Sequence, residues 1–416
     1  MDTLPHTPLT SLLQYSFRAG SGYRLVVFDR LPPEEQAALA ELQTDPDFYG
    51  VLLPREGSLR TVKAVGRDTA LLWWTLTEPG PLPFFVWSGG TEGAEAAQGI
   101  IDLVMDGVLE IADGEGFVAG AAAAGLLLPA SSPRTSQGKL AQLSAEALRH
   151  AEALGAADPA VLVASLYGYN RQPVTAAWAR RLPDRPAVLD FLGAAPASPL
   201  GRRLAAGWDR ASGEAEPEGW IAWRYRGRKG AASNRSSGAS AGRAAFKLYL
   251  SPAIEALPAA FAAVVETLED AGRGDFKVGS DAAGLLRPDK LVLYFSGQEE
   301  LLAAAENLSR RLPGLPTQGV PFTAEIGLDG ALSWGMDPPK SARLVSWHEG
   351  ESWRIWVVRR LALALLAARD GMPEQREQHQ VEGGLEPWQF ALERLRREGV
   401  DVDRWTPAAH IWQAAA

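Results

Sequence analysis

Apolar and polar positions alternate over short runs in the C-terminal half of the chain, and longer segments with helical spacing separate these runs. The short runs, typical of strands, are FKLYL (246–250), FKVG (276–279), KLVLYF (290–295) and GVPFTAEI (319–326). The longer segments, typical of helices, are 251–272, 297–314, 351–371 and 386–399. Strand-like runs that alternate with helical segments predict an α+β fold, in which a mostly antiparallel sheet packs against helices. Ser251 is the expected N-cap of the first of these helices.

The N-terminal half has a mixed and helical pattern and ends at a change in composition. Residues 48–65 predict two strands joined by a polar turn, and residues 66–76 then show helical spacing. A hairpin followed by a helix has the outline of a winged helix, and it loosely resembles the peptide-recognition element of enzymes that modify ribosomal peptides. An ordinary structural subdomain is the alternative. The predicted domains are a mixed α/β region for peptide or partner binding (1–135), a helical region (136–215) and an α+β domain (216–416).

Composition and charge narrow the function classes. The 416 residues carry a formal net charge of -9, which argues against a nucleic-acid partner because such partners favour a basic surface. The chain has no cysteine and its five histidines lack metal-site spacing, so we expect no metal and no cofactor. No apolar run reaches the length of a membrane helix, and the first residues lack the order of a signal peptide. These features predict a cytoplasmic protein.

A basic segment without acidic residues lies at the start of the third predicted domain. Between residues 220 and 247 its seven cations are Arg224, Arg226, Arg228, Lys229, Arg235, Arg243 and Lys247. The Gly/Ser-rich middle of this segment favours a loop between two strands. The loop is either a solvated hairpin connection or a lid that closes over an anionic substrate.

Cations also occur within the predicted strands, where lysine is rarely buried without a partner. In one interpretation Lys247, Lys277, Arg287 and Lys290 form structural ion pairs or extend to the surface; their candidate partners are Asp281, Asp289, Glu325 and Asp337. In the other, Arg287 and Lys290 hold a phosphate group. Lys277, desolvated among cations, then has a lowered pKa and acts as a base.

Several motifs of the third predicted domain resemble a known family. FKLYLSP, FKVGSDAAGLLRPDKLVLYF, GVPFTAEI, ALSWGMDPP and SWRIWVVRRLA occur in the order found in the HopA-type family, first named for a type III secretion effector. Members of this family also serve as the lyase of class V lanthipeptide and thioamitide biosynthesis. The resemblance spans roughly residues 220–407 and implies a phospholyase domain. It also implies a separate aminoglycoside-phosphotransferase-like kinase as partner, in a hetero-complex, and a phosphorylated precursor peptide as substrate.

A more distant similarity assigns roles to individual residues. Phosphothreonine lyase effectors carry a KFHxSV strand, a WKVTD strand about thirty residues later, then an Arg, and a Tyr on the next strand. By position, Lys277 corresponds to the base that removes the Cα proton, Lys247 and Arg287 to phosphate ligands, and Tyr294 to a residue that places the substrate. The His of the effectors, the expected proton donor, is replaced here by Tyr249.

Three further sets of residues complete the predicted site. His348 is an alternative proton donor, because the unperturbed phenol of Tyr249 is a weaker acid than imidazolium. Arg354 is a further candidate phosphate ligand. Glu325 and Asp337 are expected either to orient a lysine or bind the peptide, or to serve as salt-bridge partners.

The sequence therefore predicts a phosphoserine/phosphothreonine lyase that forms dehydroalanine or dehydrobutyrine in a precursor peptide. A secreted effector or a non-catalytic phosphopeptide-binding module is the alternative. The two differ at Lys277, since a binding module keeps the Arg and Lys ligands but has no use for a neutral lysine.

Overall fold

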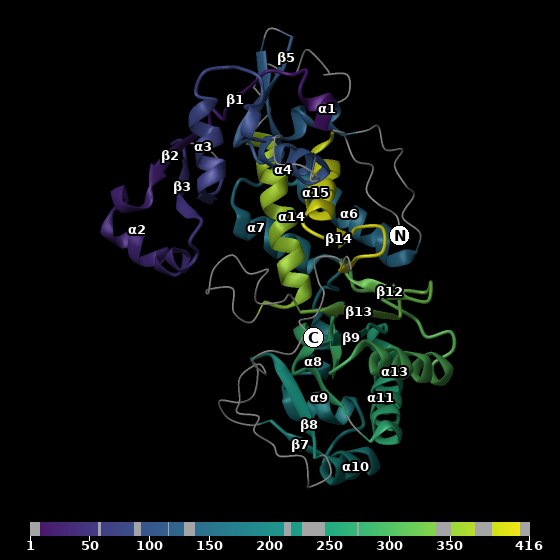
Figure 1. The fold of residues 1–416 in the computed structure, drawn as a ribbon. Helices are drawn as coiled ribbons and strands as arrows, with labels where there is room; N and C mark the ends of the chain where they lie inside the picture. The colour runs from purple at the N-terminus through teal and green to yellow at the C-terminus, as the bar shows by residue number, and fades with distance from the viewer. Residues whose placement is uncertain are drawn as a thin grey trace. The chain divides into compact units, whose positions relative to one another are not determined.

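The computed structural model describes residues 9–56, 60–86, 93–114, 116–128, 138–211, 218–226, 246–272, 274–337, 351–370 and 385–407. Within these ranges the chain forms helices and antiparallel sheets (Figure 1). The predicted α+β class is therefore confirmed. Among the described helices, none combines the length and the apolar character that a membrane span requires.

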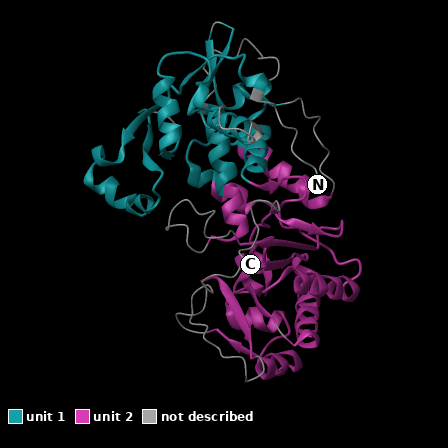
Figure 2. Ribbon diagram, in the orientation of Figure 1, with its two compact units in different colours: residues 1–134, 152–162, 359–398 teal, residues 135–151, 163–358, 399–416 magenta. Residues whose placement is uncertain are grey.

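The chain divides into two compact units, and each unit gathers segments that are far apart in the sequence (Figure 2). The first comprises residues 1–134, 152–162 and 359–398, and the second comprises residues 135–151, 163–358 and 399–416. The domains expected from the sequence, 1–135, 136–215 and 216–416, are consecutive segments and not sets of separate segments. They stay predictions.

The first unit holds two three-stranded antiparallel sheets, with strand orders β1-β5-β6 and β2-β3-β4. Its strands are β1 (Phe17–Ala19), β2 (Tyr23–Val27), β3 (Phe48–Pro54), β4 (Lys63–Gly66), β5 (Leu109–Asp113) and β6 (Gly116–Val118). Its helices are α1 (Leu9–Leu12), α2 (Pro33–Ala38), α3 (Arg67–Thr75), α4 (Gly93–Met105), α5 (Ala124–Leu127) and α15 (Pro387–Arg397). The hairpin β3–β4 and the helix α3 occupy the segments where the sequence predicts two strands and a helix.

The second unit is built on a seven-stranded antiparallel sheet with strand order β12-β13-β9-β11-β10-β8-β7. These strands are β7 (Trp208–Arg210), β8 (Trp220–Tyr225), β9 (Phe246–Leu250), β10 (Asp275–Gly279), β11 (Leu291–Phe295), β12 (Ala324–Ile326) and β13 (Leu332–Met336). A two-stranded sheet joins β14 (Val400–Asp401) to β15 (Thr406–Pro407). Its helices are α8 (Ala176–Arg181), α9 (Arg185–Phe191), α10 (Pro199–Gly207), α11 (Leu257–Ala271), α12 (Ala282–Leu285) and α13 (Gln298–Arg311). Three helices have residues in both units: α6 (Lys139–Ala153), α7 (Pro159–Gly168) and α14 (Trp353–Asp370).

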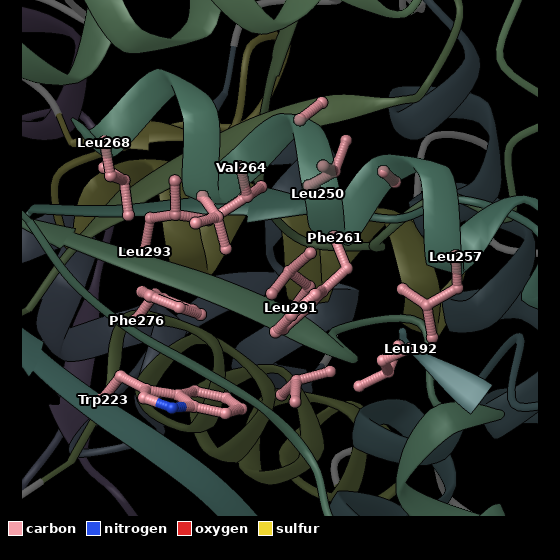
Figure 3. Close-up of a cluster of buried hydrophobic side chains, with 14 of the residues drawn as sticks. Leu192, Trp223, Leu250, Leu257, Phe261, Val264, Leu268, Phe276, Leu291 and Leu293 are labelled. Atoms are coloured by element: carbon pink, nitrogen blue, oxygen red, sulfur yellow. The ribbon is translucent and has the colours of Figure 1, made fainter. Parts of the chain in front are cut away.

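One face of the seven-stranded sheet packs on the main hydrophobic core. Alternate residues of the central strands face α11, which lines the core with residues three or four apart, as Figure 3 shows. Phe276 lies in the middle of this core, where its ring stacks on Trp223 at 5.0 Å between centroids and meets the edge of Phe261 at 5.9 Å. Since side chains alternate along a strand, the next residue, Lys277, has to point to the opposite face.

The helix after β9 begins later than predicted, and Ser251 is not its N-cap. α11 starts at Leu257, with Ala256 in the N-cap position. The hydroxyl of Ser251 instead donates to the carbonyl oxygen of Pro288 at 2.6 Å and accepts from the backbone N–H of Gly319 at 3.1 Å. A buried hydroxyl between two loops satisfies backbone groups that no helix reaches, which outweighs a local capping preference.

Replacing Phe276 by Ala should lower the free energy of unfolding by about 3–5 kcal/mol, because the aromatic core around it cannot collapse to fill the space. Chemical denaturation followed by circular dichroism measures this change. Leu328→Ala, at a side chain that is 79% exposed, is the matched control and should leave the transition in place. An equal effect of both substitutions would contradict the assignment of Phe276 to the core.

Candidate functional site

The face of the sheet opposite the core carries polar residues that the sequence singles out. Lys277 and Tyr249 are each paired with Val292 across neighbouring strands, and Tyr294 is paired with Lys247. Directly paired residues point to the same face of a sheet. Four predicted site residues are therefore brought together by the register of β9, β11 and β10, whereas alternation along the sequence places only Lys247 and Tyr249 on one face.

Cationic side chains and aromatic rings alternate in one unbroken series on this face. From one end to the other the series, here called the cation–aromatic series, is Lys247, Tyr294, Lys277, Trp220, Arg287, Tyr167 and Arg354. The distances from cation to ring centroid are, in this order, 5.7, 5.7, 4.1, 4.8, 5.7 and 4.4 Å. All lie within the roughly 6 Å over which the face of a ring attracts a cation. The series holds four positive groups that would otherwise repel one another.

Carboxylates neutralise the two ends of the series. At one end, Nζ of Lys247 lies 2.5 Å from Oδ1 of Asp337. At the other end, Arg287 donates from Nε and Nη2 to the two oxygens of Asp289, at 2.9 Å each. Nη1 of Arg354 lies 2.9 Å from Oδ2 of the same carboxylate. Four cations thus share two carboxylates, and the series carries a positive surplus while its lysines are protonated.

Lys277 lies in the middle of the series and has no ion pair or hydrogen bond to any residue that the structure describes; its neighbours are the rings of Trp220 and Tyr294. Burial lowers the pKa of its ammonium from 10.5 to about 8, and the positive charge of Lys247 acts in the same direction. The attraction of Asp289 only partly opposes this shift. Lys277 therefore has a substantial neutral fraction near pH 8, as a general base requires.

Asp289 is buried, 4% exposed, and is tightly held. Burial alone would raise the pKa of this carboxyl group, but Arg354 and Arg287 outweigh it and hold the pKa well below its usual range. The hydroxyl of Tyr167 also donates to Oδ2 at 3.0 Å. Arg354, 1% exposed, spends its other donors on the carbonyl oxygens of Tyr167 at 2.9 Å and Pro321 at 3.2 Å. Arg354 therefore holds the carboxylate, which in turn aligns Arg287.

A tight turn after β10 delivers Arg287 to the series. Gly279 ends β10, and a Cβ placed there would lie 2.4 Å from the backbone carbon of Gly284 in α12. Any larger residue would push α12 away from the strand. Asp281 accepts from the N–H of Gly284 at 2.7 Å and caps this short helix, so it is not available to a lysine. The close approach fixes where the following residues, including Arg287, return to the sheet.

Lys290 and Glu325 lie in other surroundings. Lys290 is completely buried, and its ammonium donates to the carbonyl oxygen of Pro252 at 2.7 Å and to the side chain of Gln318. Burial lowers the pKa of Lys290 to about 7. Glu325 accepts from the N–H of Leu140 at the start of α6, at 3.1 Å, and burial raises its pKa. Both side chains are engaged with protein groups, and we leave both out of the proposed site.

The two tyrosines of the sheet are held in the phenol form. Burial raises the pKa of Tyr249 well above its usual value, and the charge of Asp337 adds to the shift. The pKa of Tyr294 rises for the same two reasons. A phenol with a raised pKa releases its proton reluctantly, so Tyr249 is better suited to donate a hydrogen bond than to transfer a proton.

Two predictions fall on residues outside those described. His348, the alternative proton donor, lies in the segment 338–350, and the central part of the basic loop spans residues 227–245. Within the described ranges, no group of three or more His, Asp or Glu side chains is arranged to hold a metal ion.

Sequence reasoning missed two aromatic members of the series, Tyr167 and Trp220. Tyr167 stands near the end of a helix whose spacing predicts no chemistry, and Trp220 begins the strand before the basic loop, a segment in which only the cations pointed to a ligand. Trp220 shares strand parity with Ala222, which is paired with Lys277, so both side chains belong to the face of the lysine. No local pattern carries this information, because it depends on which strand β8 pairs with.

Comparison with known proteins gives distant structural similarity alone. No family model and no curated protein matches the chain. Among solved structures, an effector protein from Pseudomonas syringae pv. tomato strain DC3000 is 12% identical, with a TM-score of 0.38, over 65% of this chain and 98% of that one. An effector protein from Pseudomonas syringae pv. syringae strain 61 is 14% identical, with a TM-score of 0.36, over 66% and 99%. The similarity is thus to effector proteins and is too weak to carry a functional conclusion; the resemblance to a lanthipeptide lyase stays a prediction.

Replacing Asp289 by Asn should destabilise the second unit by about 3–5 kcal/mol, because the buried guanidinium group of Arg354 and the partly buried one of Arg287 lose their counter-charge. Thermal and chemical denaturation measure the loss. Asp209→Asn is the matched control, since Asp209 also pairs with an arginine but is largely exposed, and it should change little. Equal stability of the two variants would show that Asp289 does not hold the arginines in solution.

Proposed function

We propose that this protein is a phosphoserine/phosphothreonine lyase, in which Lys277 is the base that removes the Cα proton of a phosphorylated residue in a peptide. The observation that carries the proposal is the position of Lys277. It is a half-buried lysine without a carboxylate partner among the described residues, between two cations, with its pKa lowered to about 8. Such surroundings are costly for a lysine that serves only the fold, and they suit a base that works near neutral pH.

The reaction is a β-elimination. The neutral amine of Lys277 takes the Cα proton and becomes an ammonium group, and the C–H electron pair forms the Cα=Cβ double bond. The Cβ–O bond breaks, and its electron pair leaves with the phosphate oxygen. Near pH 8 the phosphate ester is a dianion, because its second pKa is about 6, so the leaving oxygen takes a proton from water as the Cβ–O bond breaks, and hydrogen phosphate departs.

The rest of the series is suited to the phosphate. Arg287 uses Nε and Nη2 on Asp289 and Tyr167, while Nη1 donates no hydrogen bond to a described residue. Its side chain is 18% exposed, so Nη1 is a donor that a phosphate oxygen can accept from. Lys247, 13% exposed, supplies a second positive charge. Preorganised cations of this kind stabilise negative charge that develops on a leaving group.

Arg354 has a supporting role in this proposal. It is buried and committed to Asp289 and to two carbonyl oxygens, so it orients Arg287 through the carboxylate and does not bind phosphate. Asp337 also has a supporting role, because its carboxylate holds the ammonium group of Lys247 directly. Tyr249 donates a hydrogen bond to the substrate. The proposed substrate is a ribosomal precursor peptide phosphorylated by a separate kinase, and the product is dehydroalanine or dehydrobutyrine.

A phosphopeptide-binding module without catalysis is the second candidate, because the positive surplus of the series would also hold a phosphate that does not react. The two candidates make different demands on Lys277. A phosphate ligand works best as a permanent ammonium, whereas the lowered pKa of Lys277 weakens it as a ligand near pH 8 and improves it as a base. This difference favours the lyase.

Lys277→Ala and Lys277→Arg should each reduce elimination from a phosphoserine peptide by about 10²–10⁴-fold, since neither side chain is a base near pH 8. Mass spectrometry detects the loss of the elements of phosphoric acid, and fluorescence anisotropy of a labelled phosphopeptide checks that binding persists. Lys139→Ala, at an exposed lysine of the same unit, is the control. Full turnover by Lys277→Ala would refute the role, and binding without turnover by the wild-type protein would favour the binding module.

The rate of elimination by the wild-type protein should rise with pH through about 8 and level off above it. Below this pH Lys277 is protonated and has no electron pair for the Cα proton, and above it the amine is neutral. Values of kcat/KM measured between pH 6 and 10 give the apparent pKa. A profile that is flat across this range would contradict Lys277 as the base.

A further inference from the structure

Trp220 lies between the two groups to which the proposed function assigns the chemistry. The centroid of its ring is 4.1 Å from Nζ of Lys277 and 4.8 Å from the guanidinium carbon of Arg287. No other ring of the described residues contacts both of these cations. The indole is 8% exposed and belongs to the small apolar cluster on this face, so its position is fixed by packing.

Backbone contacts of its strand also fix the position of Trp220. Trp220 begins β8 and is paired with Gly279 at the end of β10, and its carbonyl oxygen accepts from the guanidinium group of Arg185 at 3.3 Å. The residue before it, Gly219, accepts at its carbonyl from the N–H of Ser280 at 3.1 Å. Backbone contacts on both sides therefore hold this end of β8 against the turn that carries Arg287.

An amine that acts as a base needs a fixed position. An ion pair is the usual way to fix a lysine, but it would also keep the amine protonated. A carboxylate beside Lys277 would raise the pKa of the amine and keep it protonated. The face of an aromatic ring attracts the ammonium form more weakly than a carboxylate does, and it also remains in contact with the neutral amine. A ring can thus locate the lysine in both of the protonation states that the reaction passes through.

We propose that Trp220 is a positioning residue for Lys277, whose indole face holds the amine and Arg287 side by side over one substrate. This inference rests on the proposed function for its catalytic consequence. Its structural part, that the indole sets the surroundings of the Lys277 amine, stands independently of that function.

Two substitutions test the proposal. Trp220→Phe keeps a ring face over the lysine, whereas Trp220→Ala removes it and admits water. Because burial is the largest cause of the lowered pKa of Lys277, the Ala variant should raise this pKa by at least about one unit toward 10.5, while the Phe variant keeps it near 8. The pKa is measured from the pH dependence of acetylation at Lys277, quantified by mass spectrometry on the full-length folded chain.

The same two variants should also differ in the rate of elimination. Trp220→Ala should lower kcat for elimination by about tenfold or more and shift the pH profile upward, and Trp220→Phe should restore most of the rate. Trp334→Ala is the control for the loss of a large ring, because Trp334 lies on the core face of the same sheet and contacts Phe246. It should leave the acetylation pKa of Lys277 near 8.

The outcomes are distinct. An unchanged pKa of Lys277 in a folded Trp220→Ala variant overturns the proposal, and so does an equal loss of rate in the Phe and Ala variants. If the wild-type protein eliminates no phosphate, the proposed function fails, but the acetylation measurements still decide whether Trp220 sets the surroundings of Lys277. A raised pKa in Trp220→Ala together with rescue by Phe supports both the position and its consequence.

Discussion

The arrangement of the second unit depends on the alternation of cations and aromatic rings across one face of its sheet. Four positive groups lie close to one another, and one aromatic ring lies between each cation and the next. The carboxylates Asp337 and Asp289 balance only the ends. Lys277 is left in the middle as the one cation of the series that no described carboxylate pairs with, and this imbalance is what makes the face a candidate anion site.

The buried carboxylate of Asp289 is better explained by the site than by stability. Burying a charge costs several kcal/mol, and attraction to its partners often only offsets that cost. An apolar replacement of the whole group would serve the core as well. Such a replacement would not align Arg287, which donates to Asp289 from Nε and Nη2 and leaves Nη1 without a partner among the described residues. A costly structural feature beside a lysine with a lowered pKa is the pattern expected where function sets the requirements.

A second polar network steadies the loop that carries Arg287. The ammonium of Lys290 binds the carbonyl of Pro252 and the side chain of Gln318, and Gln318 donates to the carbonyl of Leu286 at 3.1 Å. The hydroxyl of Ser251 donates to the carbonyl oxygen of Pro288. These contacts hold the segment 286–290 at Leu286, Pro288 and Lys290. A lysine predicted to bind phosphate thus has an immediate structural task.

The sequence by itself determined which residues share a face of the sheet. Alternation with a period of two is a local property, so it assigns Lys247 and Tyr249 to one face, and Lys277 and Phe276 to opposite faces, whatever the partner strands are. In the functional interpretation it also predicted a lowered pKa for Lys277, and burial lowers this pKa in the folded chain. Local patterns failed where a residue serves distant segments, as Ser251 does when it joins two loops in place of capping a helix.

Only the tertiary structure decided which side chains meet across the chain. Tyr167 reaches Asp289 from a helix 122 residues earlier, and Trp220 reaches Lys277 through the pairing of β8 with β10. Such contacts depend on strand order, register and helix packing, which many sequences with the same local pattern would arrange differently. The sequence therefore supplied the cations and their faces, whereas the fold chose their partners, and the choice of partner decides whether a lysine is a salt-bridge residue or a base.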